Sequence, residues 1–153
     1  MLFAGFDKEE ALKVTFVTTI LAVAALLWLD APVRAEGNLA SRPERLETLS
    51  LGADLSFSVT EYRLETGEYY RWRIESQGGE EFMLRSPDLF RNAWIEQVVI
   101  NDVELHPGGG FYGIEFDDEG IADVWFVPIR PGNFDYFVSG FETRGMVGTF
   151  GVR

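Results

Sequence analysis

Cysteine is absent from the 153 residues, and histidine occurs once, at His106. Without cysteine the chain can form no disulfide, so its fold depends on a hydrophobic core alone. The same absence excludes a metal centre that needs a thiolate, and a single histidine excludes one that needs two imidazoles. No serine lies in a recognisable nucleophile motif and no pair of carboxylates stands out. We therefore expect that the protein is not an enzyme.

Lysine is nearly as scarce, since it occurs only at Lys8 and Lys13. Residues 36–153 carry ten arginines against 21 aspartates and glutamates, a net charge near −11. This balance argues against nucleic acid or an anionic membrane surface as a partner, because both attract cationic patches. We expect a protein partner, either basic or membrane-associated, rather than a nucleic acid or a small molecule.

One long apolar run is present, residues 14–29, and it is shorter than the ~20 residues that usually span a bilayer. The small residues within 31–35 then offer a cleavage site. The pattern predicts a hydrophobic N-terminal helix in residues 1–35 that is either a signal peptide or an anchor. Both interpretations place the folded part in the periplasm or elsewhere outside the cytoplasm.

Residues 36–45 are polar and predict a linker, and residues 46–153 predict one domain of short strands. Apolar residues alternate with polar ones in residues 70–75, 112–116, 122–126 and 134–138. Turn residues separate these segments at intervals of about 8–12 residues, which is typical of an antiparallel β-sandwich. A single turn of helix is predicted in residues 88–94, after Pro87.

The C-terminal segment, residues 131–153, has the sequence PGNFDYFVSGFETRGMVGTFGVR: a strand, a glycine-containing loop and a second strand. It resembles the C-terminal signature of the cupredoxins, the small blue-copper proteins, in which P-G-x-Y-x-Y-x-C precedes a histidine and then G-M-x-G. The earlier stretch ETGEYYRWRIESQGGEEF is similar to the strand that leads to the first ligand histidine of that family. The resemblance covers roughly residues 46–153 and implies an all-β, Greek-key β-sandwich with the cupredoxin-like fold.

The resemblance also assigns four copper-ligand positions to this chain: Phe82, Val138, Phe141 and Met146. The family has histidine, cysteine and histidine at the first three, and only the weak axial methionine is retained here. The implied protein is a cupredoxin-like domain without a type 1 copper site, which binds no cofactor and acts as a protein-binding or accessory structural module. The alternative is a periplasmic copper-binding or electron-transfer protein that uses non-standard ligands.

Two interpretations of the vacated positions are compatible with each other. Apolar side chains there can close the end of the sandwich as ordinary core. They can also form a docking patch, because redox partners of the cupredoxins contact an apolar surface at this end. That patch would contain Phe141, with Phe111 and Tyr112 beside it if their loops meet at the same end.

Two other metal sites are conceivable from the residue types. Met83, Met146 and His106 could together hold Cu(I), since thioether and imidazole groups suit that ion. The acidic residues 115–120, with Asp123 after them, could hold Ca²⁺ in a loop. Their spacing matches no twelve-residue calcium loop, and solvated charge at a hairpin tip is the simpler interpretation.

Overall fold

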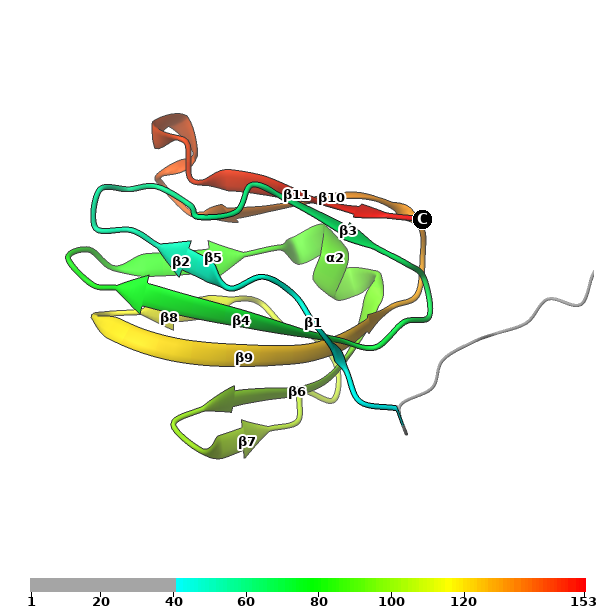
Figure 1. The fold of residues 1–153 in the computed structure, drawn as a ribbon. Coiled ribbons are helices and arrows are strands. Elements are labelled where there is room, and N and C mark those ends of the chain that lie inside the picture. The colour runs from blue at the N-terminus through cyan, green and yellow to red at the C-terminus, as the bar shows by residue number, and fades with distance from the viewer. Residues whose placement is uncertain (1–40) are drawn as a thin grey trace, which may run out of the picture. The chain divides into compact units, whose positions relative to one another are not determined.

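Strands account for most of the computed structural model, which describes residues 41–153. They form two sheets that pack face to face (Figure 1). This arrangement confirms the β-sandwich predicted from the alternating segments. The helix predicted within residues 1–35 lies outside the described residues. Between residues 41 and 153, no helix is both long enough and apolar enough to cross a membrane.

Sheet A is built around β4 and β9, which pair in antiparallel register from Tyr70 opposite Phe126 to Gln77 opposite Glu119. The sheet continues from β9 to β6 and then to β7. In spatial order its strands are β1 (Glu44–Arg45), β4 (Tyr70–Gln77), β9 (Glu119–Pro128), β6 (Ala93–Ile100) and β7 (Val103–Leu105), and β2 (Leu49–Leu51) also pairs with β4.

Sheet B packs opposite sheet A. The C-terminal strand of the chain lies within sheet B and pairs with one neighbouring strand on each side. In spatial order its strands are β3 (Glu61–Leu64), β11 (Val147–Val152), β10 (Gly132–Val138), β5 (Phe82–Arg85) and β8 (Ile114–Phe116). The two stretches that resemble the cupredoxin signature therefore contribute neighbouring strands, β5 and β10.

Three strand pairs are parallel, which differs from the antiparallel sandwich predicted. β1 and β2 run parallel to β4, and β3 runs parallel to β11. The chain passes from β2 in sheet A to β3 in sheet B before it returns as β4, so β3 serves as the crossover that parallel neighbours require. β1 begins at Glu44, inside the segment predicted as a linker.

Strand β4 shows how the sequence selects the inner face of the sandwich. Trp72 and Ile74 are fully buried, whereas the alternate residues Arg71 and Arg73 are half-buried on the outer face. Successive side chains of a strand point to opposite sides, so the sequence alternation becomes an apolar inner row. Burial of each large apolar side chain contributes about 1.5–3 kcal/mol of transfer free energy.

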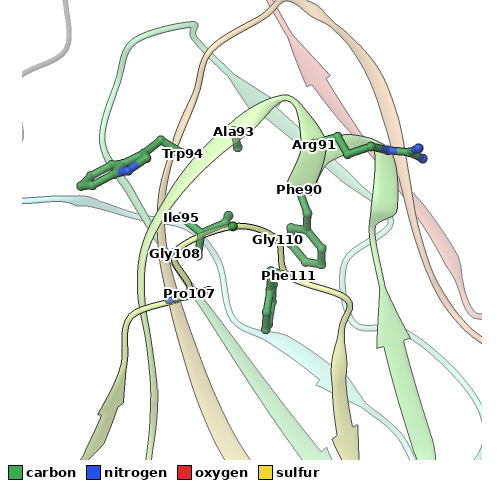
Figure 2. Close-up of a pocket in the computed structure, with 10 residues that line it drawn as sticks. Phe90, Arg91, Ala93, Trp94, Ile95, Pro107, Gly108, Gly110 and Phe111 are labelled. Atoms are coloured by element: carbon green, nitrogen blue, oxygen red, sulfur yellow. The ribbon is translucent and has the colours of Figure 1, made fainter.

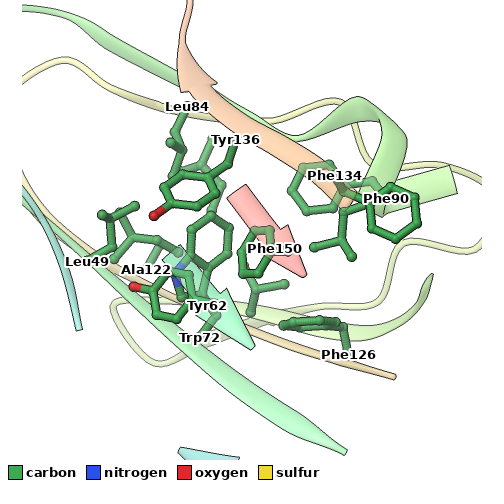
Figure 3. Packing of buried hydrophobic residues seen from close by; sticks show 14 of the residues in the cluster. Leu49, Tyr62, Trp72, Leu84, Phe90, Ala122, Phe126, Phe134, Tyr136 and Phe150 are labelled. Carbon is green, nitrogen blue, oxygen red and sulfur yellow. The ribbon is translucent and has the colours of Figure 1, made fainter. Parts of the chain in front are cut away.

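Aromatic rings fill the centre between the sheets (Figure 3). The ring centroid of Tyr136 lies 4.9 Å from that of Phe150 and 5.6 Å from that of Trp72. Phe150 also stacks on Tyr62 at 5.1 Å. Offset and edge-on pairs of this kind add about 0.5–1.5 kcal/mol each beyond their burial.

The buried tyrosine hydroxyls find backbone partners at the margins of this cluster. Tyr136 donates a hydrogen bond to the carbonyl of Val59 at 2.6 Å, and Tyr62 donates one to the carbonyl of Glu47 at 2.9 Å. Both bonds satisfy polar groups that would be costly to bury alone. They fix the segments before β3 and before β2 against the core.

A short helix, α2 (Pro87–Arg91), follows β5 and begins with proline, whose fixed backbone angle suits the first helical position. Asp88 and Arg91 form an ion pair along it at 2.8 Å. The helix ends at Arg91 rather than continuing through Trp94 as predicted, because the chain from Ala93 onward pairs with β9.

The β6–β7 hairpin forms the margin of sheet A. Its turn consists of Asn101 and Asp102, both in the left-handed region with φ of 49° and 63°. Asn and Asp tolerate this conformation, which is the one that a tight two-residue hairpin needs. β6 also carries a bulge between Ile95 and Gln97. β7 pairs only with the last three residues of β6, from Val98 to Ile100. The first half of β6 therefore lies beside the loop that follows β7.

Candidate functional site

The four positions implied as copper ligands come from two adjacent strands of sheet B and the loop that follows one of them. Phe82 begins β5, and Val138 ends β10 with Leu84 of β5 as its register partner. The loop contains a 3-10 turn, η1 (Glu142–Arg144), and it reverses direction at two glycines with positive φ, Gly140 and Gly145.

These positions are packed together and apolar. The rings of Phe82 and Phe141 meet edge to face, with centroids 6.0 Å apart. Val138 donates its backbone N–H to the carbonyl of Met146 at 3.1 Å, and Phe141 donates to that of Val138 at 3.0 Å. Phe82, Val138 and Met146 are completely buried, while Phe141 is half-buried. The structure thus brings the four predicted residues to one end of the sandwich.

The donor set of this group does not fit type 1 copper. Such a centre needs one thiolate and two imidazoles, with a thioether as a weak fourth ligand. Phe82, Val138 and Phe141 provide no donor atom, and the thioether of Met146 would act alone. The positions are therefore filled as core, in agreement with the first of the two interpretations above.

The structure does not bring together the three residues considered as Cu(I) ligands. Met146 is buried in the core, whereas Met83 alternates to the outer face of β5, with its Sδ beside Gly113. His106 lies in the loop after β7 and its Nδ1 is 3.0 Å from the carbonyl oxygen of Glu96. The three side chains occupy the interior, the outer face of sheet B and the margin of sheet A.

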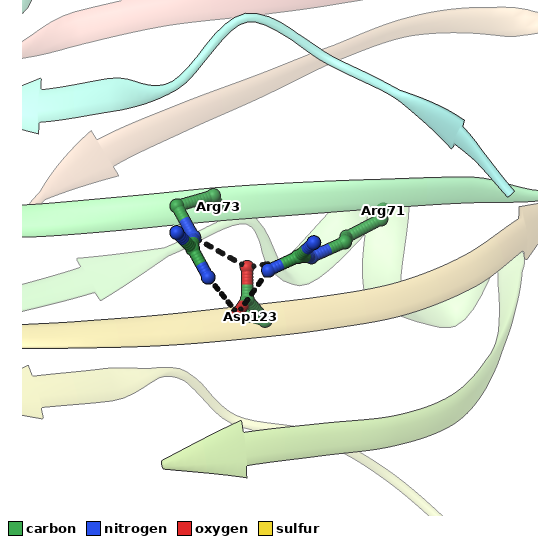
Figure 4. Close-up of polar contacts among 3 residues, drawn as sticks. All are labelled: Arg71, Arg73 and Asp123. Atoms are coloured by element: carbon green, nitrogen blue, oxygen red, sulfur yellow. Dashed lines mark hydrogen bonds and ion pairs between the residues drawn. The ribbon is translucent and has the colours of Figure 1, made fainter. Parts of the chain in front are cut away.

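The acidic segment considered for Ca²⁺ is also divided. Asp123 lies under two arginines on the outer face of sheet A (Figure 4). Its Oδ1 and Oδ2 accept hydrogen bonds from Nε and Nη2 of Arg71 at 3.0 and 2.8 Å, and from the same atoms of Arg73 at 3.0 and 2.9 Å. No group of three histidine or acidic residues within the described part of the chain is arranged to hold a metal ion.

The two arginines also decide the protonation of Asp123. Burial disfavours the charged carboxylate, but the hydrogen bonds and positive charges of Arg73 and Arg71 outweigh it and lower the pKa of Asp123 below its ordinary value. Alternation predicts that Arg71 and Arg73 share a face, but the sequence gives no sign that Asp123 lies opposite them. Their function is to join β4 to β9.

The structure separates Phe141 from Phe111 and Tyr112, which corrects the proposed three-residue patch. Phe141 contacts Phe82 at the start of β5, where Phe116 of β8 is the register partner. β8 runs antiparallel to β5, so the residues before Ile114 extend toward the other end of the sandwich. The ring of Phe111 accordingly packs on α2, 4.7 Å from that of Phe90.

Tyr112 also lies away from Phe141. It is 64% exposed, and the guanidinium of Arg85 lies 4.1 Å from the centroid of its ring. The contact is a cation–π interaction on the outer side of sheet B.

A cavity of about 420 Å³, not anticipated from the sequence, lies between β6 and the loop after β7 (Figure 2). The rings of Phe90 and Phe111 form one wall, and Trp94 and Ile95 border it along β6. Residues 107–110 complete the lining, and added Cβ atoms at Gly108 to Gly110 would meet nothing within 4 Å. The only sequence signal was the three consecutive glycines, which indicated a loop but not what it faces.

Comparisons with known proteins bear on the fold. No family model matches the sequence, and a search among curated proteins finds no relative. Among solved structures, a multicopper oxidase from Pseudomonas thermotolerans and a laccase from Pediococcus acidilactici each give a TM-score of 0.56 over 82% of this chain, at 15% and 13% identity. A copper nitrite reductase from Nitrosomonas europaea gives 0.50 over 63%, at 10% identity.

These matches show the cupredoxin-like fold implied by the sequence signature. At this level of identity they show the fold alone. The chain covers 33%, 30% and 33% of the three matched proteins, so it spans about a third of their length. Their copper chemistry is a property of those longer enzymes.

Proposed function

We propose that this cupredoxin-like domain has lost the type 1 copper site and acts as a non-catalytic protein-binding or accessory module outside the cytoplasm. The observation that carries the proposal is the packing of Phe82 against Phe141 above the buried Val138 and Met146. Apolar side chains fill the volume in which a metal ion would need ligand atoms. A role that depends on electron transfer through copper has no ligand set to support it.

A binding role is supported by what the domain leaves exposed. Within residues 41–153, seven large apolar side chains remain at least a third exposed, several of them at the margins of the two sheets: Trp94, Val103, Leu105, Tyr112, Ile121, Ile129 and Val147. Single exposed apolar residues are ordinary, but neighbouring ones at a sheet margin are typical of contact surfaces. Export is supported by the apolar run in residues 14–29 and the small residues that follow it.

The test of this proposal is copper loading. The purified chain is incubated with excess copper in each oxidation state, passed through a desalting column, and analysed for metal and for visible absorption. We expect far less than one copper per chain and no charge-transfer band. One tightly held copper per chain would overturn the proposal, whichever residues bound it.

The alternative copper carrier needs Met83, Met146 and His106 to act together, and no observation favours it. A triple variant, Met83→Leu, Met146→Leu and His106→Gln, keeps the volumes similar. We expect its Cu(I) affinity, measured by competition with a coloured chelator, to equal that of the wild type. A loss of affinity in the triple variant would restore the carrier function.

A further inference from the structure

Strand β7 has an apolar face on the inner side of sheet A, and no strand of sheet B covers it. In the hairpin register Val103 lies opposite Ile100 and Leu105 opposite Val98. Val98 points into the core, and residues directly opposite each other in an antiparallel pair share a face. Val103 and Leu105 therefore project from the inner side of sheet A, yet they are 58% and 50% exposed.

The reason lies in the widths of the two sheets. Sheet B ends at the three-residue strand β8, whereas sheet A continues past β6 to β7 (Figure 1). A hollow of about 200 Å³ lies between the end of β6 and residues 114–121, and it is lined by Ile100, Ile114 and Ile121 among others. Val103 lies opposite Ile100, so the inner face of the hairpin adjoins this hollow.

The segment that forms this side of the sandwich carries charge of a single sign. Residues 92–129 contain eight carboxylates and neither lysine nor arginine. Two of the eight are used inside the domain: Asp123 binds Arg71 and Arg73, and Glu96 accepts a hydrogen bond from Tyr69. The remaining six are exposed and, in residues 41–153, form no ion pair with an arginine: Asp102, Glu104, Glu115, Asp117, Asp118 and Glu119. His106 lies beside one of them, with its Nε2 3.8 Å from Glu104.

We call Val103 and Leu105, together with the exposed carboxylates of the β6–β7 turn and the β8–β9 turn (Asp102, Asp117, Asp118 and Glu119), the hairpin surface. We infer that the hairpin surface binds a cationic amphipathic helix of a protein partner. This inference rests on the proposed function and specifies the partner's chemistry. The apolar side chains require an apolar stripe, and a single segment covers a sheet face most simply as a helix. The carboxylates require lysine or arginine beside that stripe.

Charge also argues against other occupants. An anionic lipid surface or a nucleic acid would bring further negative charge to the carboxylates of this surface. A second copy of this surface would do the same, since like charges brought together across an interface repel each other. A cationic segment gains from the same field, which raises its association rate at low ionic strength.

The experiment uses the purified chain and a synthetic peptide of about 18 residues, with leucine on one helical face and lysine on the other. A scrambled peptide of the same composition is the first control. Binding is measured by calorimetry and mapped by amide chemical shifts, at low and at physiological ionic strength. We expect the amphipathic peptide to bind, to weaken with salt, and to shift residues 100–105 and 114–121.

Two pairs of variants assign the site. Val103→Ser with Leu105→Ser should weaken binding by about tenfold or more, whereas Val147→Ser with Ile129→Ser, exposed elsewhere, should leave it unchanged. Asp117→Asn, Asp118→Asn and Glu119→Gln should reduce affinity and salt dependence. The control triple Glu61→Gln, Glu65→Gln and Asp88→Asn makes the same change in net charge at residues that already pair with arginines, and it should have a smaller effect.

Three results would overturn the inference: no binding at low salt, equal binding of the scrambled peptide, or shifts confined to another surface. Self-association that is lost in the Val103→Ser, Leu105→Ser variant would do the same, because the occupant would then be a second copy. None of these results depends on the outcome of the copper-loading experiment. If the chain binds no copper and also fails to bind the peptide, the proposed function stands and only the inference about the hairpin surface is wrong.

Discussion

The ring of Tyr136 lies directly over Gly148, its register partner in β11. A Cβ atom built on Gly148 would overlap the Cζ and hydroxyl oxygen of Tyr136. The same hydroxyl donates a hydrogen bond to Val59, so the ring cannot move aside without breaking that bond. The second glycine of the G-M-x-G motif is thus required by packing, whatever residues occupy the neighbouring positions 82, 138 and 141.

Replacing Gly148 with alanine should therefore destabilise the domain by about 1–3 kcal/mol or more, the usual cost of overpacking a filled core. Urea denaturation followed by tryptophan fluorescence measures the change. Gly109→Ala is the matched control, since a Cβ there meets no atom within 4 Å. Equal effects of the two substitutions would show that the Tyr136 ring does not constrain this position.

Phe82→Ala should cost about 3–5 kcal/mol of stability, because it removes a fully buried ring and leaves a cavity beneath Phe141. Ile129→Ala, at a residue 55% exposed, should change the free energy of unfolding by about 0.5 kcal/mol or less. Thermal and chemical denaturation of both variants tests the pair. A small loss for Phe82→Ala would mean that the vacated positions are a loose surface rather than core.

Acid should weaken the domain partly through Asp123. The pKa of this carboxyl is lowered in the folded state, so its contribution to stability is complete above the unfolded value of 3.8 and is lost as the pH falls below it. The free energy of unfolding, measured between neutral and strongly acidic pH, should fall less steeply in Asp123→Asn than in the wild type. At neutral pH the same variant should be less stable, because Arg71 and Arg73 then lose their shared anion. Parallel pH profiles would contradict this role.

Alkali should act on the buried tyrosines. Burial raises the pKa of Tyr62 to about 12 from an ordinary value of 10.0, and burial also raises the pKa of Tyr136. The neutral phenol is thus favoured by folding, so stability is complete below pH 10.0 and declines as the pH rises toward 12. Tyr62→Phe should show a shallower decline than the wild type between these limits. Chemical denaturation of both proteins at a series of pH values measures the two declines. An identical decline in the two proteins would contradict the assigned role of Tyr62.

Much of the fold was accessible from the sequence because strand alternation is a local signal. Residues 70–75 and 134–138 alternate clearly, and both became central strands with the predicted inner row. The convergence of Phe82, Val138, Phe141 and Met146 was also accessible, since the signature fixes the order of strands that brings them together. Local patterns and a family signature were sufficient for these features.

Features that depend on strand direction were not accessible. Alternation is identical in parallel and antiparallel strands, so the parallel pairs of β1, β2 and β3 left no trace in the pattern. The position of Tyr112 depends on which way β8 runs beside β5, and the expected patch with Phe141 was inaccurate for that reason. Asp123 meets Arg71 only through the register of β4 and β9, some fifty residues apart in the chain.

The run without lysine or arginine in residues 92–129 is visible in the sequence, but its meaning depends on the structure. Only the structure shows that two of its carboxylates are used internally and that others, at the β6–β7 and β8–β9 turns, lie beside an uncovered sheet face. A count of charge along windows of the sequence would have identified the run. It would not have identified Val103 and Leu105 as inner-face residues.

The loop of residues 139–146 is held by backbone hydrogen bonds and by the contact of Phe141 with Phe82, where a copper protein would use metal bonds. In metalloproteins the free energy of metal binding contributes to that of folding, so chelators and reductants alter their melting temperature. This domain should melt at the same temperature with or without either reagent. If the proposed function holds, its persistence in the cell should be independent of the supply and oxidation state of copper.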